Sequence, residues 1–245
     1  MRAEEEVVDS LEASLRAAGT AHRAEGERAY LKSDLDFTGT LNAAVRAEIT
    51  RLDRELPLDH DSVSRLVDAL WGRRVFELRL AAAYLLQRHT DRLSTTDLVT
   101  IERLVRESGT WALVDELAVH VLGRRVVADA RGVSPVMDRW ASDADFWIRR
   151  SSLLCELRPI RAGAALDRFL LRAEPMLEER EFFVRKAIGW VLREAGKRQP
   201  DVVVAWLAPR TDRASGVTMR EAVKYLPTQD AARLMSGYRE RRPSG

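Results

Sequence analysis

The sequence predicts an all-α fold, built as a short α-solenoid of two-helix repeats. Three observations support this prediction. Apolar residues recur at helical spacing along nearly the whole chain, sustained alternation of period two is absent, and similar segments return every 34 to 36 residues. A length of 245 residues is enough for one sizeable domain or a short array of repeats. We therefore interpret residues 1–245 as a single domain.

The N-terminal segment, residues 1–26, is predicted to be helical because Val7, Leu11 and Leu15 recur every four residues. Its first ten residues are acidic and lack the apolar run of a signal peptide. No stretch of the chain approaches the roughly 18 apolar residues that are needed to span a bilayer. We therefore expect a cytoplasmic protein that has no membrane partner.

Short turns separate the helices that follow. Proline or glycine interrupts the apolar pattern at residues 56–59, 107–110, 174–175 and 208–209. None of these turns is long enough to be an interdomain linker. The repeats are predicted to occupy residues 27–226, and residues 227–245 are predicted to form a C-terminal helix and tail.

Internal similarity defines the register of the repeats. Segments of the form Phe-x-x-Arg begin at Phe76, Phe146 and Phe182, and each leads into an apolar helix, as Met219-Arg220 also does. Successive intervals of 36, 34, 36 and 35 residues, the length of a two-helix repeat, separate the aligned residues Arg79, Asp115, Arg149, Arg185 and Arg220.

Equivalent positions of a solenoid line one continuous surface, usually the concave one. Four arginines and one aspartate are therefore expected to share a concave basic groove. The alternative is that the arginines form internal caps and salt bridges between repeats. This alternative accounts for the arginines better than it accounts for Asp115.

The formal net charge of +2 conceals an asymmetry. Residues 146–245 carry 20 basic and 12 acidic side chains, whereas residues 1–145 carry 20 and 26. A basic C-terminal half supplies the phosphate-facing surface that a nucleic-acid-binding protein needs, although a mixed solvated surface is the ordinary alternative. Arginine provides 36 of the 40 basic residues, which suits bidentate phosphate contacts but is also typical of a GC-rich genome.

Cysteine and histidine content argues against a metal. Cys155 is the only cysteine, so an internal disulfide and a cysteine-based zinc site are both excluded. The four histidines are too scattered to form a helical pair of ligands at i, i+4; they are His22, His60, His89 and His120. We expect neither a metal nor a cofactor.

One group of residues has the composition of a candidate catalytic site. A helix places Trp111 and Asp115, four residues apart, on the same face, so that an indole lies beside a carboxylate. A second indole, Trp190, lies on the helix two repeats later. The ordinary alternative is that the tryptophans belong to the core and that Asp115 pairs with an arginine of the groove.

Four segments in order along the chain resemble signature segments of the AlkD-type alkylpurine DNA glycosylases, a family of HEAT-like-repeat proteins. The similarity extends from about residue 27 to residue 226, and the segments are residues 30–39, 110–115, 146–150 and 182–194. The family often has a proline and paired arginines after its Phe-x-Gly element, whereas this chain has residues 40–46, TLNAAVR. This departure weakens any inference about lesion-side contacts there.

The resemblance implies a monofunctional glycosylase that hydrolyses the N-glycosidic bond of cationic N3- or N7-alkylated purines in double-stranded DNA. The departing base leaves neutral, so no leaving group needs a proton. Asp115 would stabilise the oxocarbenium cation of the sugar and position the attacking water, while Trp111 and Trp190 would flank the deoxyribose. No obligate protein partner is implied, and we expect a monomer.

The resemblance also implies a set of DNA contacts. Arg150 and Arg149 match positions that hold the DNA backbone, and Arg150 is favoured over Arg149 for contact near the lesion. The remaining candidates are Arg193, Lys186, Lys197, Tyr30 and Phe183. Members of the family grip the backbone and leave the lesion in or near the duplex. Bulky adducts would then be accommodated, as in homologues that protect producers of DNA-alkylating natural products.

Two other functions stay open. A noncatalytic member of the family would bind DNA structures without excising a base, which the set of Trp111, Asp115 and Trp190 argues against. A HEAT-type scaffold would instead bind a peptide or a helix of a partner protein, and Asp115 would then be structural.

Overall fold

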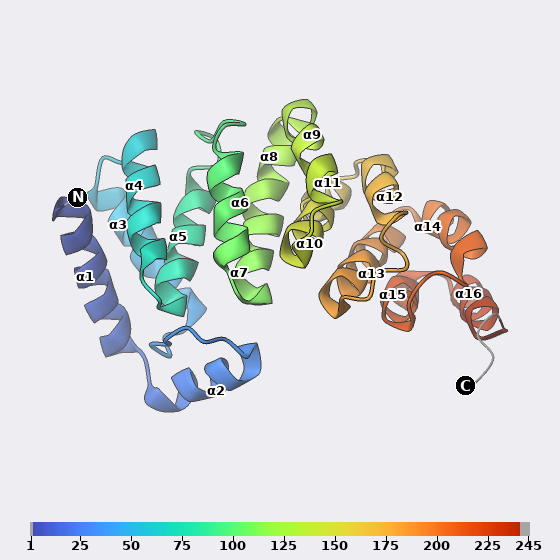
Figure 1. Cartoon of the computed structure of the whole chain (residues 1–245), viewed down its shortest axis with the longest axis horizontal. Coiled ribbons are helices and arrows are strands. Elements are labelled where there is room, and N and C mark those ends of the chain that lie inside the picture. Colours follow the sequence, from blue (N-terminus) through green and yellow to red (C-terminus); the bar gives the residue numbers. More distant parts are fainter. Residues whose placement is uncertain (1, 241–245) are drawn as a thin grey trace. The chain divides into compact units, whose positions relative to one another are not determined.

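A computed structural model describes residues 2–240, with side chains from Glu4 onward (Figure 1). Helices dominate the described residues, which contain one isolated bridge, between Asp36 and Val75, and no strand. The all-α class and the architecture of helical repeats are confirmed. Contacts divide the chain into two compact units, up to Val121 and from Leu122 onward. The concave groove and the assignment of a single domain stay predictions.

The first unit contains α1 (Arg2–Ala18), α2 (Ala21–Leu31), α3 (Asn42–Glu55), α4 (His60–Gly72), α5 (Phe76–Arg88), α6 (Leu98–Glu107), α7 (Trp111–Asp115) and the π-helix η1 (Glu116–Leu122), whose last residue begins the second unit. Helix α5 packs between α3 and α7 in one row, and α4 packs against α1 and α5. The predicted turns at residues 56–59 and 107–110 lie between helices, which confirms them.

The second unit contains α8 (Gly123–Ala128), α9 (Ala130–Trp140), α10 (Phe146–Leu154), α11 (Leu157–Arg161), α12 (Asp167–Ala173), α13 (Phe182–Gly196), α14 (Pro200–Leu207), η2 (Ala208–Arg210), α15 (Gly216–Ala222), η3 (Val223–Tyr225) and α16 (Thr228–Glu240). Helix α13 packs between α10 and α15. Residues 174–175 form a turn, and residues 208–209 belong to a short 3₁₀ turn. The predicted C-terminal helix is α16, and tail residues 241–245 lie outside the described residues.

The repeat arginines have a shared structural role. Arg79, Arg149 and Arg185 are each the fourth residue of their helix, and each donates to a backbone carbonyl six residues earlier, in the loop that leads into that helix. The acceptors are the carbonyls of Arg73, Asp143 and Glu179, at 3.3, 2.7 and 2.5 Å. These three arginines therefore act as internal caps. Internal capping was the alternative to the hypothesis that the arginines line a shared groove.

Arg220 and Asp115 depart from this pattern. The structure gives the side chain of Arg220, which is exposed on α15, no hydrogen bond or ion pair among the described residues. Asp115 carries a carboxylate, which has no proton to donate to a carbonyl when it is ionised. The loop before α7 is held in another way: Arg79 donates to the Glu107 carbonyl at 2.7 Å, and Gly109 turns the chain with a φ of 61°. Position 115 therefore does not carry the capping arginine that three other register positions carry.

Glu77 anchors the segment between α2 and α3. Its carboxylate is fully buried and accepts hydrogen bonds from three successive backbone N–H groups. The donors are Thr38, Gly39 and Thr40, at 2.9, 2.8 and 3.3 Å. Burial of a carboxylate is tolerated here because the backbone donors replace its lost hydration.

Helix α2 is attached to the first unit mainly through its ends, since none of its residues is buried. Thr20 caps its start by accepting from the Arg23 N–H, and the helix runs unbroken through residue 26. At the same end the backbones of Gly19 and Gly39 approach so closely that a Cβ on Gly39 would lie 2.1 Å from the Thr20 carbonyl oxygen. Glycine is therefore required at this contact.

The core of the second unit contains a buried ion cluster and the lone thiol. Arg172 and Glu156, 3% and 1% exposed, pair at 2.7 Å, and Arg168 also binds Glu156. Cys155 next to them is fully buried and donates to the Ser152 carbonyl. Burial raises the pKa of this thiol far above its usual range.

Replacement of Glu77 by alanine is expected to lower the free energy of unfolding by about 3 kcal/mol or more, because three buried N–H groups lose their acceptor. Urea denaturation followed by circular dichroism measures this loss. Glu25→Ala, at an exposed site on α2, is the control and should leave stability nearly unchanged. A loss below about 1 kcal/mol for Glu77→Ala would contradict the anchoring role.

Candidate active site

Trp111 and Asp115 are the first and last residues of α7. Gly109 turns the chain and Thr110 adopts an extended conformation before the helix, so that Trp111 opens the first turn. Leu113 and Val114 are buried, while Trp111 and Asp115 are both partly exposed. The helix therefore presents the indole and the carboxylate on one solvent-accessible face, as their spacing predicts.

The backbone changes its hydrogen-bonding pattern directly after Asp115. Residues Glu116–Leu122 form a π-helix, in which each turn contains an additional residue. Such turns are rare and are found frequently at functional sites. In this chain Leu117, Ala118 and Val121 of the π-helix are fully buried, so the wide turn is fixed in the core. This irregular element supports the backbone at Asp115.

Tyr30 reaches the same place from α2. Its ring lies 5.9 Å from the ring of Trp111 in an edge-to-face arrangement, with an interplanar angle of 86°. The tyrosine is 72% exposed and lies one residue before the end of α2, where Lys32 adopts the left-handed conformation. Tyr30, Trp111 and Asp115 therefore belong to one exposed site in the first unit, which joins two of the segments that the sequence singled out.

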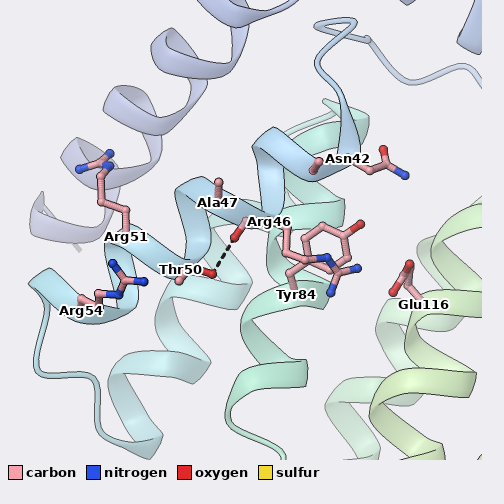
Figure 2. Close-up of a pocket in the computed structure, with 9 residues that line it drawn as sticks. Asn42, Arg46, Ala47, Thr50, Arg51, Arg54, Tyr84 and Glu116 are labelled. Atoms are coloured by element: carbon pink, nitrogen blue, oxygen red, sulfur yellow. Dashed lines mark hydrogen bonds between the residues drawn. The ribbon is translucent and has the colours of Figure 1, made fainter.

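A groove of about 700 Å³ lies beside this site, between α3, α5 and Glu116 of the π-helix (Figure 2). Arg46 lies over the ring of Tyr84, at 3.9 Å, and donates to the side chain of Gln87. Gln87 in turn donates to the Glu116 carboxylate at 2.7 Å. Burial, and next the charge of Glu116, raise the pKa of Tyr84.

Sequence reasoning assigned no role to these groove residues. Arg46 ends the segment that departs from the family pattern, which was the only signal that the sequence contained. Glu116 directly follows Asp115, but nothing in the sequence indicated that its side chain would meet residues from α3 and α5.

Trp190 lies on the third turn of α13 in the second unit and is partly exposed. Gly189 before it allows α13 to pack directly on α15, because a Cβ there would lie 2.6 Å from Cβ of Glu221. This close packing fixes the rotation of α13 about its axis. The orientation of Trp190 therefore depends on the glycine that precedes it.

Phe183 belongs to a cluster of four aromatic rings at the starts of α10 and α13. Ring centroids lie 4.4 to 6.4 Å apart among Phe146, Trp147, Phe182 and Phe183. Arg150 and Lys186 lie over rings of this cluster, each at 5.8 Å. Arg150 is buried and donates to the Phe183 carbonyl, whereas Lys186 is exposed. The cluster is thus partly aromatic and partly cationic.

Three other candidate cations have carboxylate partners within the second unit. Arg149 pairs with Glu179 at 2.8 Å, Arg193 pairs with Glu221 at 2.6 Å, and Lys197 pairs with Glu194 at 2.9 Å. Burial alone would raise the pKa of Glu179, but N–H donors of the Arg180–Glu181 turn and the Arg149 charge outweigh it, so this pKa is lowered. Hydrogen bonds from Lys197 and Arg161 likewise outweigh burial and lower the pKa of Glu194.

The structure thus brings the candidates together in two sets. The first unit contains Tyr30, Trp111 and Asp115, and the second contains Trp190, Phe183 and the cationic candidates Arg149, Arg150, Lys186, Arg193 and Lys197. Within residues 2–240, no group of three or more His, Cys, Asp and Glu side chains is arranged to hold a metal ion. None of the described helices is both long and apolar enough to cross a membrane.

The fold and the site together define a class of protein. It is an all-α protein of stacked helical repeats that presents a carboxylate and an indole on one helical face. Residues 11–226 match the DNA alkylation repair enzyme family, and the chain belongs to that family. The resemblance to AlkD-type proteins is thereby confirmed, and DNA alkylation repair is the function class of the protein. No curated protein matches the sequence.

Two solved structures share the fold. A protein from Enterococcus faecalis described as a predicted DNA alkylation repair enzyme has a TM-score of 0.78 and 23% identity, over 86% of this chain and 97% of its own. AlkD2 from Streptococcus mutans has a TM-score of 0.62 and 17% identity, over 77% of this chain and 91% of its own. At these identities the likeness establishes the fold.

Replacement of Glu179 by glutamine should destabilise the protein in a pH-dependent way. A carboxyl whose pKa is lowered by folding from 4.5 contributes stability that is fully present above that value and is lost as the pH falls through the lower folded-state pKa. The difference in unfolding free energy between wild type and Glu179→Gln should therefore be largest near neutral pH. Urea melts at neutral pH and at successively lower pH below 4.5 measure it; a constant difference would contradict the lowered pKa.

Proposed function

We propose that the protein is a monofunctional DNA glycosylase that removes cationic N3- or N7-alkylated purines from duplex DNA. The observation that carries this proposal is the exposed site in the first unit. There the single carboxylate in the repeat register lies on the same helical face as Trp111 and is followed by a π-helix. Membership of the DNA alkylation repair enzyme family supplies the substrate class.

The chemistry requires little beyond the stabilisation of a positive charge. Alkylation at N3 or N7 makes the purine cationic, so the glycosidic bond is already weakened and the base departs neutral. Positive charge develops on the deoxyribose as this bond breaks. A fixed carboxylate and the electron-rich face of an indole both stabilise such a charge more strongly than they stabilise the neutral sugar of the ground state.

Asp115 is assigned the central role in this mechanism. Its carboxylate stabilises the oxocarbenium cation and orients the water molecule that adds to the anomeric carbon, and the proton of this water is released to solvent. Trp111 and Trp190 flank the deoxyribose. Tyr30, in edge-to-face contact with Trp111, sets the orientation of that indole and lies near the damaged pair. No general acid is needed, since the leaving purine is neutral.

DNA contacts are assigned according to the ion pairs that the second unit contains. Lys186 is exposed and has no carboxylate within ion-pair distance among the described residues, so its charge is available to a phosphate. Arg149, Arg193 and Lys197 share their charges with carboxylates. Arg150 supports the backbone of Phe183, and through it the aromatic cluster. Contact with the backbone, without complete flipping of the base, leaves space for a bulky adduct.

Asp115→Asn should reduce base excision at least about 100-fold while duplex binding stays within a few-fold of wild type, because the change removes the charge and keeps the shape. The assay measures released base and alkali-labile abasic sites, with 7-methylguanine in one duplex and a bulky N3-adenine adduct in another. Asp91→Asn, at an exposed site in the same unit, is the control. Full activity in Asp115→Asn would remove this residue from the mechanism.

The same assay separates the proposal from its alternatives. Tight duplex binding by the wild type without release of either base would instead indicate a noncatalytic DNA-binding protein. Weak, nonspecific DNA affinity without product would indicate a protein-binding scaffold. The relative rates on the two substrates would identify the preferred lesion.

Lys186→Ala should weaken duplex binding. It should also reduce the magnitude of the slope of log K against log[salt] by about 0.9, as expected when one phosphate contact is lost. Lys197→Ala is the matched control at the end of the same helix, since this lysine is paired with Glu194. Fluorescence anisotropy over a range of KCl concentrations measures both slopes. Equal slopes for the two variants would contradict the assignment of Lys186 as a phosphate contact.

A further inference from the structure

Glu116 is a second carboxylate at the candidate active site, and no role has been assigned to it. It directly follows Asp115, is partly exposed and begins the π-helix. Its backbone N–H donates to the carbonyls of both Ala112 and Leu113, which fixes the backbone between the two acidic residues. Two carboxylates therefore extend from successive positions of one well-defined turn.

The carboxylate of Glu116 is not neutralised by an ion pair. Among the described residues no Lys, Arg or His lies at ion-pair distance from it, and its hydrogen-bond donor is the neutral amide of Gln87, at 2.7 Å. By contrast, Asp53 of α3 pairs with both Arg88 and His89. Glu116 therefore keeps its negative charge on the groove beside the candidate active site.

Gln87 keeps Glu116 apart from Arg46. Arg46 of α3 donates to the amide oxygen of Gln87 at 3.2 Å, while the amide nitrogen of Gln87 donates to Glu116. The amide thus presents its acceptor to the cation and its donor to the anion. Arg46 lies over the ring of Tyr84, at 3.9 Å (Figure 2). Since Gln87 is buried, it is a fixed spacer between the two charges.

The other charges of the groove lie farther along α3. Arg51 is held between two carboxylates of its own helix. Arg54 is eight residues beyond Arg46, which corresponds to about 12 Å along the helix axis, and Figure 2 shows it at the end of the groove opposite Glu116. Tyr84 stays neutral, because burial, and next the charge of Glu116, raise its pKa. Arg46 and Glu116 are therefore the opposed charges at the end of the groove next to Asp115.

A carboxylate in this position acts on a nearby charge through space. Successive helical residues have Cα atoms about 3.8 Å apart and side chains about 100° apart, which places the two carboxylates within roughly 10 Å of each other. Over such a distance one unit charge changes the relative stability of a cation by about two- to tenfold, and salt screens the effect. An ionised Glu116 therefore favours a cationic sugar beside Asp115 over a neutral one, whereas Arg46 disfavours it.

We propose that Glu116 is a specificity determinant of the candidate active site, and that its carboxylate raises the preference of the site for a cationic sugar over a neutral one. The proposal rests on the proposed function, since it takes the deoxyribose beside Asp115 as the reacting group. In that mechanism Asp115 contacts the sugar, and Glu116 adds to the negative charge without contact. Gln87 is the positioning residue that prevents Arg46 from neutralising Glu116.

The experiment compares the affinities of the full chain for two duplexes that differ in one nucleotide. One contains a pyrrolidine abasic analogue, whose ring nitrogen is protonated at neutral pH, and the other contains the neutral tetrahydrofuran analogue. The ratio of the two dissociation constants, measured by fluorescence anisotropy in about 20 mM KCl, reports the preference for positive charge. A substitution that alters stability or general DNA affinity affects both duplexes equally and leaves the ratio unchanged.

Glu116→Gln should lower the preference for the cationic duplex about two- to tenfold, and Arg46→Gln should raise it, because the two side chains have opposite charges. Both effects should shrink in about 300 mM KCl, where screening is stronger. Asp91→Asn, at an exposed site in the same unit, is the control and should leave the ratio unchanged. Glu116 is partly exposed and Arg46 is exposed, so both variants are expected to fold.

The outcomes separate this proposal from the glycosylase assignment. An unchanged ratio in Glu116→Gln, a shift of Glu116→Gln and Arg46→Gln in the same direction, or no preference of the wild type for the cationic duplex would overturn the proposal. If Asp115→Asn lowers the ratio and Glu116→Gln does not, the role of Asp115 stands and the proposal for Glu116 fails. Shifts of opposite sign in Glu116→Gln and Arg46→Gln would support it even if the wild type excised neither test lesion. If Arg46→Gln lost its structure, the salt dependence of Glu116→Gln would decide.

Discussion

The loops that lead into α5, α10 and α13 have carbonyl groups that need donors, and in each of them an arginine supplies the donor. Three repeats use a guanidinium from the first turn of the helix to bind the carbonyl six residues earlier. Each such bond closes the loop and fixes the direction in which the helix enters the stack. Three of the four periodic arginines, Arg79, Arg149 and Arg185, therefore belong to the architecture, and this explains why their spacing along the sequence follows the repeats.

The candidate active site lies where this rule is broken. Residue 115 is aspartate, and its loop is held instead by Arg79 from the previous repeat and by the left-handed turn at Gly109. A π-helix follows directly and replaces regular helical packing at the same point. Helix α2 adds Tyr30 from outside the repeat, held by the glycine contact and the buried Glu77 rather than by a core of its own.

The sequence predicted the helical class, the turns and the register, because these depend on local periodicity and on proline and glycine. It also predicted that Trp111 and Asp115 share a face, since four residues separate them. It did not predict the π-helix, because Glu116–Leu122 has the composition of an ordinary buried helix. Nor did it reveal which cations are paired: Arg149 and Arg193 meet glutamates 30 and 28 residues away, and only the packing of successive repeats brings them together.

The burial of Cys155 has a consequence for a protein that works where DNA is being alkylated. Thiolates are among the nucleophiles that electrophiles attack most readily, and reactivity requires both exposure and ionisation. The only thiol of this chain has neither, since it lies in the core and its pKa is raised by burial. The thiol of Cys155 is thus shielded from the electrophiles that create the lesions which this family repairs.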